Sequence, residues 1–146
     1  MKKLFLLLAV ILSAVEGSFS QSSSDSAGIK TTVLNYIEGY YNSDGERMAK
    51  AISPELSKRI VAKGDNGDYA VQDMGSSLLI YAAKKYKRPA DDNKEPFKAD
   101  IKIFDISYDI ATVKVTTNKF KFFDYIHLAK INGEWKIINV LWQKAG

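Results

Sequence analysis

The hydrophobic pattern of this chain changes its period near Phe97, and this change limits the folds that the chain can adopt. Before Phe97, apolar residues recur at the three- and four-residue spacing of amphipathic helices. After Phe97, they alternate with polar residues and are rich in β-branched types, which is typical of half-buried strands. Helices first and strands last predict an α+β fold, with N-terminal helices packed on one face of a curved antiparallel sheet.

Two helices are predicted at the start of the domain. An apolar stripe indicates a first helix that ends at Asn42. Ser43 and Glu46 then have the spacing of a capping box, which predicts a second short helix running to Ile52. The stripe of the first helix consists of Ile29, Val33, Tyr36, Ile37 and Tyr40.

Two further helices are predicted before the strands. Ser53 followed by Pro54 suits a helix start, because proline is tolerated at the first helical position. After a Gly- and Asn-containing turn at 64–67, Asp73 suits the N-cap of the other. The apolar residues assigned to them are Leu56 and Ile60 in the former, and Met74, Leu78, Leu79, Tyr81 and Ala82 in the latter.

A hairpin closes the chain, because Asn132-Gly133 is the dipeptide that most favours a two-residue type I′ turn. A two-residue turn determines the register, so Asp124 should lie opposite Leu141 and Ile126 opposite Asn139. The four strands are predicted around Ala99–Ile103, Ala111–Val115, Phe120–Ile131 and Glu134–Trp142.

Both faces of this hairpin carry large apolar side chains, so we expect both to be covered. Helices can cover one face, and a second copy of the chain or a ligand can cover the other. This predicts a homodimer formed through the sheet. One face is predicted to hold Phe122, Asp124, Ile126, Leu128, Lys130, Trp135, Ile137, Asn139 and Leu141, and the other Phe123, Tyr125, His127, Ala129, Ile131, Lys136, Ile138, Val140 and Trp142.

The N-terminus has the form of a cleavable secretory signal peptide. Lys2 and Lys3 precede an apolar run that is too short to span a membrane, and small residues at Ser18 and Ser20 predict cleavage before Gln21. We therefore expect a signal peptide at 1–20, a disordered polar lead-in at 21–27 and one domain at 28–144. The mature protein should be secreted or periplasmic and should keep no membrane anchor.

Composition excludes some chemistry and makes other partners unexpected. The chain has no cysteine, which excludes disulfides, thiol catalysis and thiolate metal sites. Residues 1–20 contain two lysines and one glutamate, so cleavage changes the net charge from +4 to +3. Such a small and dispersed charge does not favour nucleic-acid binding. With one histidine, His127, no two-histidine metal site is available, and we expect no metal and no cofactor.

The run from Asp124 to Asn139, DYIHLAKINGEWKIIN, resembles the closing hairpin of the putative lumazine-binding family. The segment from Gly39 to Asp44 resembles the helix-to-helix junction of the same family. The family belongs to the nuclear transport factor 2-like superfamily of cone-shaped α+β domains, which also includes ketosteroid isomerases and polyketide cyclases. The resemblance covers residues 28–142 and implies that fold, together with a small ligand held between helices and sheet. The superfamily carries unrelated activities, so the resemblance does not define the chemistry.

Asp124 is the candidate catalytic residue, because its predicted neighbours on the strand face are apolar. A buried carboxylate is costly unless it is paired, and an unpaired one has the raised pKa of a general acid or base. Asn139, its diagonal neighbour across the strands, is a candidate partner, so a purely structural role is also open. The ligand-binding residues are predicted to be Tyr36, Tyr40, Tyr81, Asp124 and Asn139.

Three functions follow from these observations. The first is an exported domain that binds a small aromatic or apolar ligand. The second is an isomerase-, dehydratase- or cyclase-like enzyme with Asp124 as general base. The third is a homodimeric interaction module without catalysis. An open cavity with Asp124 at its floor favours the second, and a filled interior favours the third.

Overall fold

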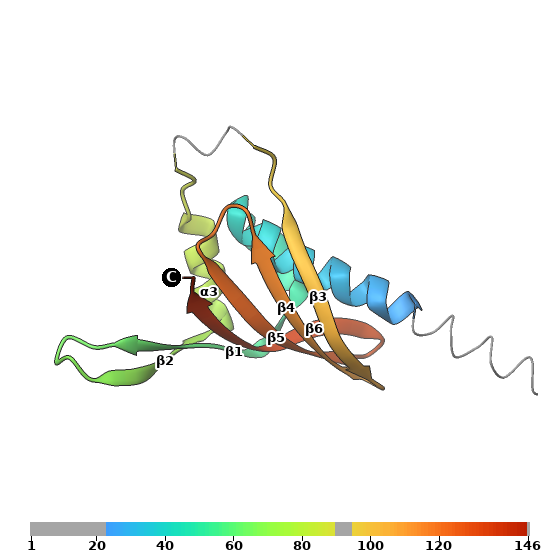
Figure 1. Ribbon diagram of the computed structural model, residues 1–146. Helices are drawn as coiled ribbons and strands as arrows, with labels where there is room; N and C mark the ends of the chain where they lie inside the picture. The colour runs from blue at the N-terminus through green and yellow to red at the C-terminus, as the bar shows by residue number, and fades with distance from the viewer. Residues whose placement is uncertain (1–22, 90–94, 146) are drawn as a thin grey trace, which may run out of the picture.

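The computed structural model describes residues 23–89 and 95–145, and they form helices packed against one curved sheet (Figure 1). The N-terminal helix occupies residues 23–41. The predicted signal peptide lies outside the described residues. The predicted lead-in is corrected, because residues 23–27 are helical and Asp25 is buried. The other elements are α2 (Gly45–Ala51), β1 (Ile52–Lys63), β2 (Tyr69–Gly75), α3 (Ser76–Lys85), β3 (Ala99–Ser107), β4 (Ile110–Thr117), β5 (Phe122–Ile131) and β6 (Glu134–Lys144).

The sheet has six strands in the order β2-β1-β6-β5-β4-β3. Strands β3 to β6 follow one another as an antiparallel meander, as their alternating pattern predicts. Strand β1 joins the other side of β6 in parallel, and β2 pairs with it antiparallel. The helices lie behind the sheet in Figure 1, so the α+β class and the curved sheet are confirmed.

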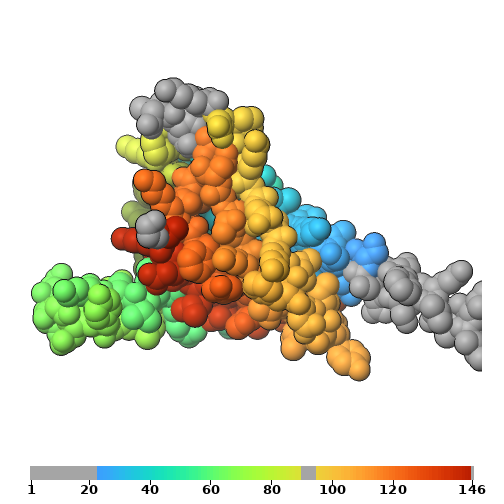
Figure 2. All heavy atoms as spheres, viewed as in Figure 1, coloured from blue at the N-terminus to red at the C-terminus, as the bar shows by residue number. Residues whose placement is uncertain are grey.

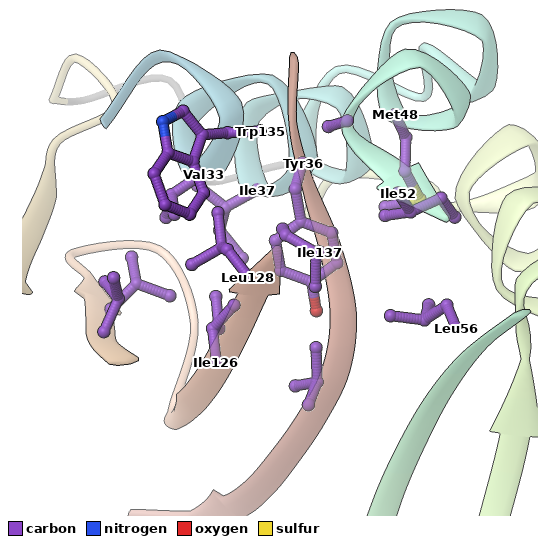
Figure 3. Close-up of a cluster of buried hydrophobic side chains, with 14 of the residues drawn as sticks. Val33, Tyr36, Ile37, Met48, Ile52, Leu56, Ile126, Leu128, Trp135 and Ile137 are labelled. Carbon is purple, nitrogen blue, oxygen red and sulfur yellow. The ribbon is translucent and has the colours of Figure 1, made fainter. Parts of the chain in front are cut away.

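The hydrophobic core lies between the N-terminal helix and the inner face of the sheet. Val33 and Ile37 of that helix are at most 1 % exposed, and they pack against Ile126, Leu128 and Ile137 of the central strands (Figure 3). These residues are the ones that the helical stripe and the strand alternation place inward. Burial of this apolar surface is the main force that holds the helix on the sheet.

The predicted helix that starts at Ser53-Pro54 is wrong, because these residues belong to β1. Leu56 and Ile60 are four residues apart, which fits one helix face and one strand face equally well. In the strand they point inward with Lys58 between them, while Arg59 and Val61 point outward. The sheet, through pairing with β6, decides between the two conformations.

The helix for which Asp73 is the predicted N-cap begins two residues later than expected, because its N-cap is Gly75 and its first residue is Ser76. Asp73 lies in β2, where it pairs with Arg59 of β1 across the antiparallel ladder. Its carboxylate contacts Ser57 and forms an ion pair with the Arg59 Nε at 3.4 Å. The second helix is also capped differently, because the Arg47 amide donates to the Asp44 side chain rather than to Ser43.

A β-bulge in β6 changes which side chains of the last hairpin face the core. The predicted turn is present, with positive φ at Asn132 and Gly133. Leu128 pairs with Ile137 as predicted, but His127 pairs with Asn139, so Ile138 is the extra residue. Beyond Ile138 the two faces exchange. Asp124 therefore lies opposite Trp142 and Ile126 opposite Val140, which corrects the predicted register.

The β1–β2 hairpin extends from the body of the molecule as an arm (Figure 2). Its apolar side chains Val61, Tyr69 and Val71 are between 48 % and 74 % exposed. Val61 and Val71 are opposite each other across the ladder, so they share one face of the arm. That face continues the outer face of the sheet.

Candidate functional site

A cavity of about 220 Å³ lies between the helices and the inner face of the sheet. The N-terminal helix and α3 form one wall, and β1, β2, β5 and β6 form the other. Most of its lining is apolar or aromatic, and Lys58 is the one charged lining residue among those that the structure describes. The lining consists of Tyr36, Ile37, Tyr40, Lys58, Met74, Leu79, Ala82, Phe122 and Trp142.

Lys58 reaches this cavity because β1 turns alternate residues inward. Its side chain is 10 % exposed. The Lys58 Nζ donates to the Tyr36 hydroxyl oxygen at 2.7 Å and to Asp124 Oδ2 at 3.0 Å. The Tyr36 hydroxyl in turn donates to the same Asp124 oxygen at 2.6 Å. These three residues form a closed triangle of hydrogen bonds, which we call the Lys58–Tyr36–Asp124 cluster.

Asp124 lies beneath the cavity and does not line it. Its side chain is fully buried, and it comes from the central strand β5. Both hydrogen bonds of the cluster end on Oδ2, while Oδ1 is buried without a hydrogen-bond partner. An unpaired buried carboxylate oxygen is costly, so Oδ1 can accept a further hydrogen bond from a donor that reaches it.

Burial and charge together shift the acid–base properties of the cluster. Burial raises the pKa of the Tyr36 hydroxyl well above its usual value, and the negative charge of Asp124 adds to that rise. Burial lowers the pKa of the Lys58 amine, and the attraction of Asp124 opposes but does not cancel this shift. Tyr36 is therefore neutral at ordinary pH, and the Lys58 amine loses its proton more readily than an exposed lysine.

Aromatic rings surround the Lys58 amine. Its Nζ lies 5.4 Å from the ring centres of Tyr36 and Phe122 and 5.2 Å from that of Trp142. Such contacts stabilise a cation that has lost its water shell. Tyr40 lines the cavity further out and packs against Tyr86, with ring centres 5.0 Å apart. The arrangement offers a polar, ionisable floor inside an aromatic wall.

The structure brings together part of the predicted site. Tyr36 and Tyr40 line the cavity, and Asp124 lies directly below it. Figure 3 shows the Tyr36 ring pointing from its helix into the core. Tyr81 does not reach the cavity, because its position on α3 faces outward and leaves it 60 % exposed.

Asn139 is not the partner of Asp124, which corrects the predicted pair. The bulge at Ile138 places Asn139 on the outer face of the sheet. There its Oδ1 accepts from Arg59 Nη1 at 2.9 Å, and its Nδ2 lies 3.2 Å from His127 Nδ1. His127 thus belongs to an exposed polar row and lies on the opposite face from Asp124.

Sequence reasoning missed Lys58, Phe122 and Trp142 as parts of the site. The start signal at Ser53-Pro54 predicts a helix around Lys58, and the regular register of the last hairpin predicts Trp142 on the face opposite Asp124. A signal for Lys58 did exist. It lies between Leu56 and Ile60 on an apolar strand face, as Asp124 lies between Phe122 and Ile126 on another. Two opposite charges on apolar faces are expected to find each other.

A wider groove of about 510 Å³ lies beside the start of the N-terminal helix. Four of its five charged lining residues pair with one another: the Lys130 Nζ lies 2.7 Å from Asp25, and the Lys136 Nζ lies 2.8 Å from Glu134. The Trp135 indole also donates to Asp25, at 3.1 Å. Because this groove is shallow and most of its charges are paired, the smaller inner cavity is the better candidate site.

Two general features of the described residues bear on the site. Residues 23–89 and 95–145 contain no cluster of three acidic or histidine side chains that could hold a metal ion. No helix in these same ranges is both long enough and apolar enough to cross a membrane.

The chain matches a known protein family over most of its length. Residues 24–143 match the family model described as putative lumazine-binding. No protein with a curated description is significantly similar to the chain.

Solved structures share the fold at low sequence identity. A nuclear transport factor 2-like protein of unknown function from Shewanella baltica OS155 has a TM-score of 0.70 and 20 % identity, covering 85 % of this chain and 96 % of its own. A putative scytalone dehydratase from Novosphingobium aromaticivorans has a TM-score of 0.61 and 11 % identity, covering 88 % and 89 %. A ketosteroid isomerase-like protein from Erwinia carotovora atroseptica has a TM-score of 0.54 and 14 % identity, covering 82 % and 95 %.

Proposed function

Since the chain belongs to the putative lumazine-binding family and has the nuclear transport factor 2-like fold, we propose that it is an exported domain that binds a small, partly aromatic ligand. The observation that carries this proposal is the cavity of about 220 Å³ with aromatic walls and the Lys58 amine at its floor. Ligand sites are typically apolar hollows with a few well-placed polar groups, and this cavity has that character. Its volume suits a ligand of about one or two rings.

Calorimetric titration of the mature protein with lumazine as the probe tests the binding part of the proposal. Ala82 lines the cavity, so Ala82→Phe should fill it and abolish binding. Tyr81→Phe on the exposed side of the same helix is the matched control and should bind as the wild type does. Native mass spectrometry of protein purified from its source would reveal a copurifying ligand of another kind. Absence of any ligand, together with no effect of Ala82→Phe, would contradict the proposal.

The export part of the proposal concerns residues 1–20. Removal of this segment would leave Gln21 as the first residue, just before the N-terminal helix at residues 23–41. Intact mass of the exported protein should show this loss. A mature protein that retains the apolar run from Leu4 to Val15 would contradict export by a cleaved signal peptide.

A second candidate function is an isomerase-, dehydratase- or cyclase-like enzyme, and the cluster supports it. Acid–base catalysis needs ionisable groups whose pKa values are displaced by burial and charge, as those of Lys58 and Tyr36 are. Asp124 is the proposed general base, and its buried position means that it would act on a ligand through Tyr36 or Lys58. Turnover of a small ketone that stops in Asp124→Asn but not in Tyr81→Phe would support this function.

A third candidate function is self-association through the outer face of the sheet. Phe104 and Tyr125 are 47 % and 39 % exposed there, and their rings stack with centres 6.2 Å apart. Val61, Ile138 and Leu141 extend the same exposed surface. Contiguous apolar surface of this kind favours a protein partner, and a second copy is the simplest one.

A further inference from the structure

We propose that Lys58 condenses with small apolar aldehydes or ketones that enter the cavity, and holds them as an imine. The proposal deepens the ligand-binding function and rests on it, because the cavity must admit the carbonyl compound. It names the chemical class of the ligand and the atom of the protein that captures it.

The position of the amine is the first argument. Lys58 is 8 % exposed and lines the cavity, and it is the one buried lysine of the described ranges. Its Nζ makes two hydrogen bonds, both on the side of Tyr36 and Asp124. A carbonyl carbon in the cavity would approach from the remaining side. Desolvation in an apolar pocket is the usual way in which a lysine becomes a nucleophile for carbonyl compounds.

The cluster also provides a place for the proton that the amine must lose. Asp124 holds an unpaired, buried Oδ1 beside the oxygen that faces Lys58. Transfer of the proton from Lys58 to Asp124, directly or through the Tyr36 hydroxyl, converts a buried ion pair into a neutral amine and a neutral acid. This lowers the electrostatic cost of burying the two charges and exposes the nitrogen lone pair.

The condensation balances with these groups alone. The Lys58 nitrogen bonds to the carbonyl carbon, and the carbonyl oxygen takes up a proton to give a carbinolamine. That oxygen then leaves as water with the two hydrogens that the neutral amine carried, and a carbon–nitrogen double bond remains. The proton stored on Asp124 can return to the imine nitrogen. No oxidant or reductant is required.

The surroundings suit the product as well as the reactant. A protonated imine is a cation, and the carboxylate of Asp124 together with the rings of Phe122 and Trp142 would stabilise it. The apolar lining, which includes Ile37, Met74 and Leu79, would receive the hydrocarbon part of the ligand. A ligand that carries a charge of its own would be disfavoured there.

The experiment uses benzaldehyde as the probe and sodium cyanoborohydride to reduce any imine to a stable amine. The mature protein is treated with both reagents at neutral pH. Peptide mapping then measures the labelled fraction of each lysine. We expect Lys58 to be labelled several-fold faster than exposed lysines such as Lys84 and Lys144, because burial lowers the pKa of its amine and leaves a larger fraction of it unprotonated. Equal or slower labelling of Lys58 would overturn the proposal.

A matched variant and a matched probe separate this proposal from the ligand-binding function. Lys58→Arg keeps a cation beside Asp124 but cannot form an imine, and it should lose the label while keeping its fold. Benzyl alcohol resembles the probe but has no carbonyl group, and calorimetry measures its binding. Binding of benzyl alcohol without label on Lys58 would overturn the imine and leave the ligand-binding function standing. Absence of both would overturn both.

Discussion

At the scale of single residues, the cluster links stability to the ionisation of buried groups. Asp124 is fully buried, and Lys58 is the cation that balances its charge. We expect Asp124→Asn to lower the free energy of unfolding by about 3–5 kcal/mol, because it leaves the Lys58 ammonium buried without a counter-charge. Unfolding in urea measures this loss.

A double variant of Asp124 and Lys58 tests whether the two residues form a stabilising pair or whether Asp124 is a functional group that destabilises the fold. Replacing both partners, as in Asp124→Asn with Lys58→Met, removes the unpaired charge and should recover part of the stability. Unchanged or increased stability of Asp124→Asn alone would instead indicate that the carboxylate is a costly functional group. If the stability loss of the double variant equals the sum of the losses of the two single variants, the pairing of Asp124 with Lys58 is contradicted.

Tyr36 predicts how stability depends on alkaline pH. Its folded pKa is raised well above 10, the value of an unfolded tyrosine, so the unfolded state loses its proton first. The unfolded state therefore binds fewer protons above pH 10, and the contribution of Tyr36 to stability falls as pH rises there. Compared with the wild type, Tyr36→Phe should lose less stability between pH 9 and 11. Parallel pH profiles of the two proteins would refute this.

At the scale of secondary-structure elements, the bulge in β6 decides which side chains build the site. Ile138 is the extra residue, and it is 37 % exposed. Its deletion would remove the bulge and keep the observed pairs, with Asn139 opposite His127, so Asn139 and Leu141 would stay outward and Val140 and Trp142 inward. We expect a loss of about 2 kcal/mol or less, since every inward side chain of β6 keeps its face.

Ile138→Ala is the control for this deletion, because it shortens the side chain but keeps the residue count. It should cost about 1 kcal/mol or less at such an exposed position. Thermal unfolding of both variants decides the comparison. A deletion that unfolds the protein while Ile138→Ala does not would contradict the assignment of Ile138 as the extra residue.

At the scale of the whole molecule, the outer face of the sheet predicts self-association. Val140 and Trp142 do not belong to this face in the structure, because they pack in or against the core. Phe104, Tyr125 and Leu141 are exposed on it instead. Light scattering of the mature protein should give twice the chain mass, and Tyr125→Lys should halve it by placing a charge in the apolar contact.

The control for this change is Tyr108→Lys. Tyr108 is 96 % exposed in the turn between β3 and β4 and lies outside the apolar surface that Tyr125 shares with Phe104. The same substitution there should leave the mass unchanged. A wild-type protein that stays monomeric at high concentration would contradict the predicted dimer.

Much of the fold was predictable because its determinants are local. The N-terminal helix, the four-strand meander and the type I′ turn each depend on the spacing of a few neighbouring residues. The family resemblance pointed to the same architecture. The importance of Asp124 was also visible locally, since a carboxylate on an apolar strand face must have a partner or a function.

Only the tertiary structure decided what that partner is. Segment 52–63 has a spacing that fits helix and strand alike, and parallel pairing with β6, about eighty residues later in the chain, makes it a strand. That pairing carries Lys58 to Asp124, and the bulge at Ile138 carries Asn139 away from it. Both events depend on contacts between distant segments. The periodicity of the sequence determined the architecture. The pairing of the strands determined which ionisable groups meet at the floor of the inner cavity.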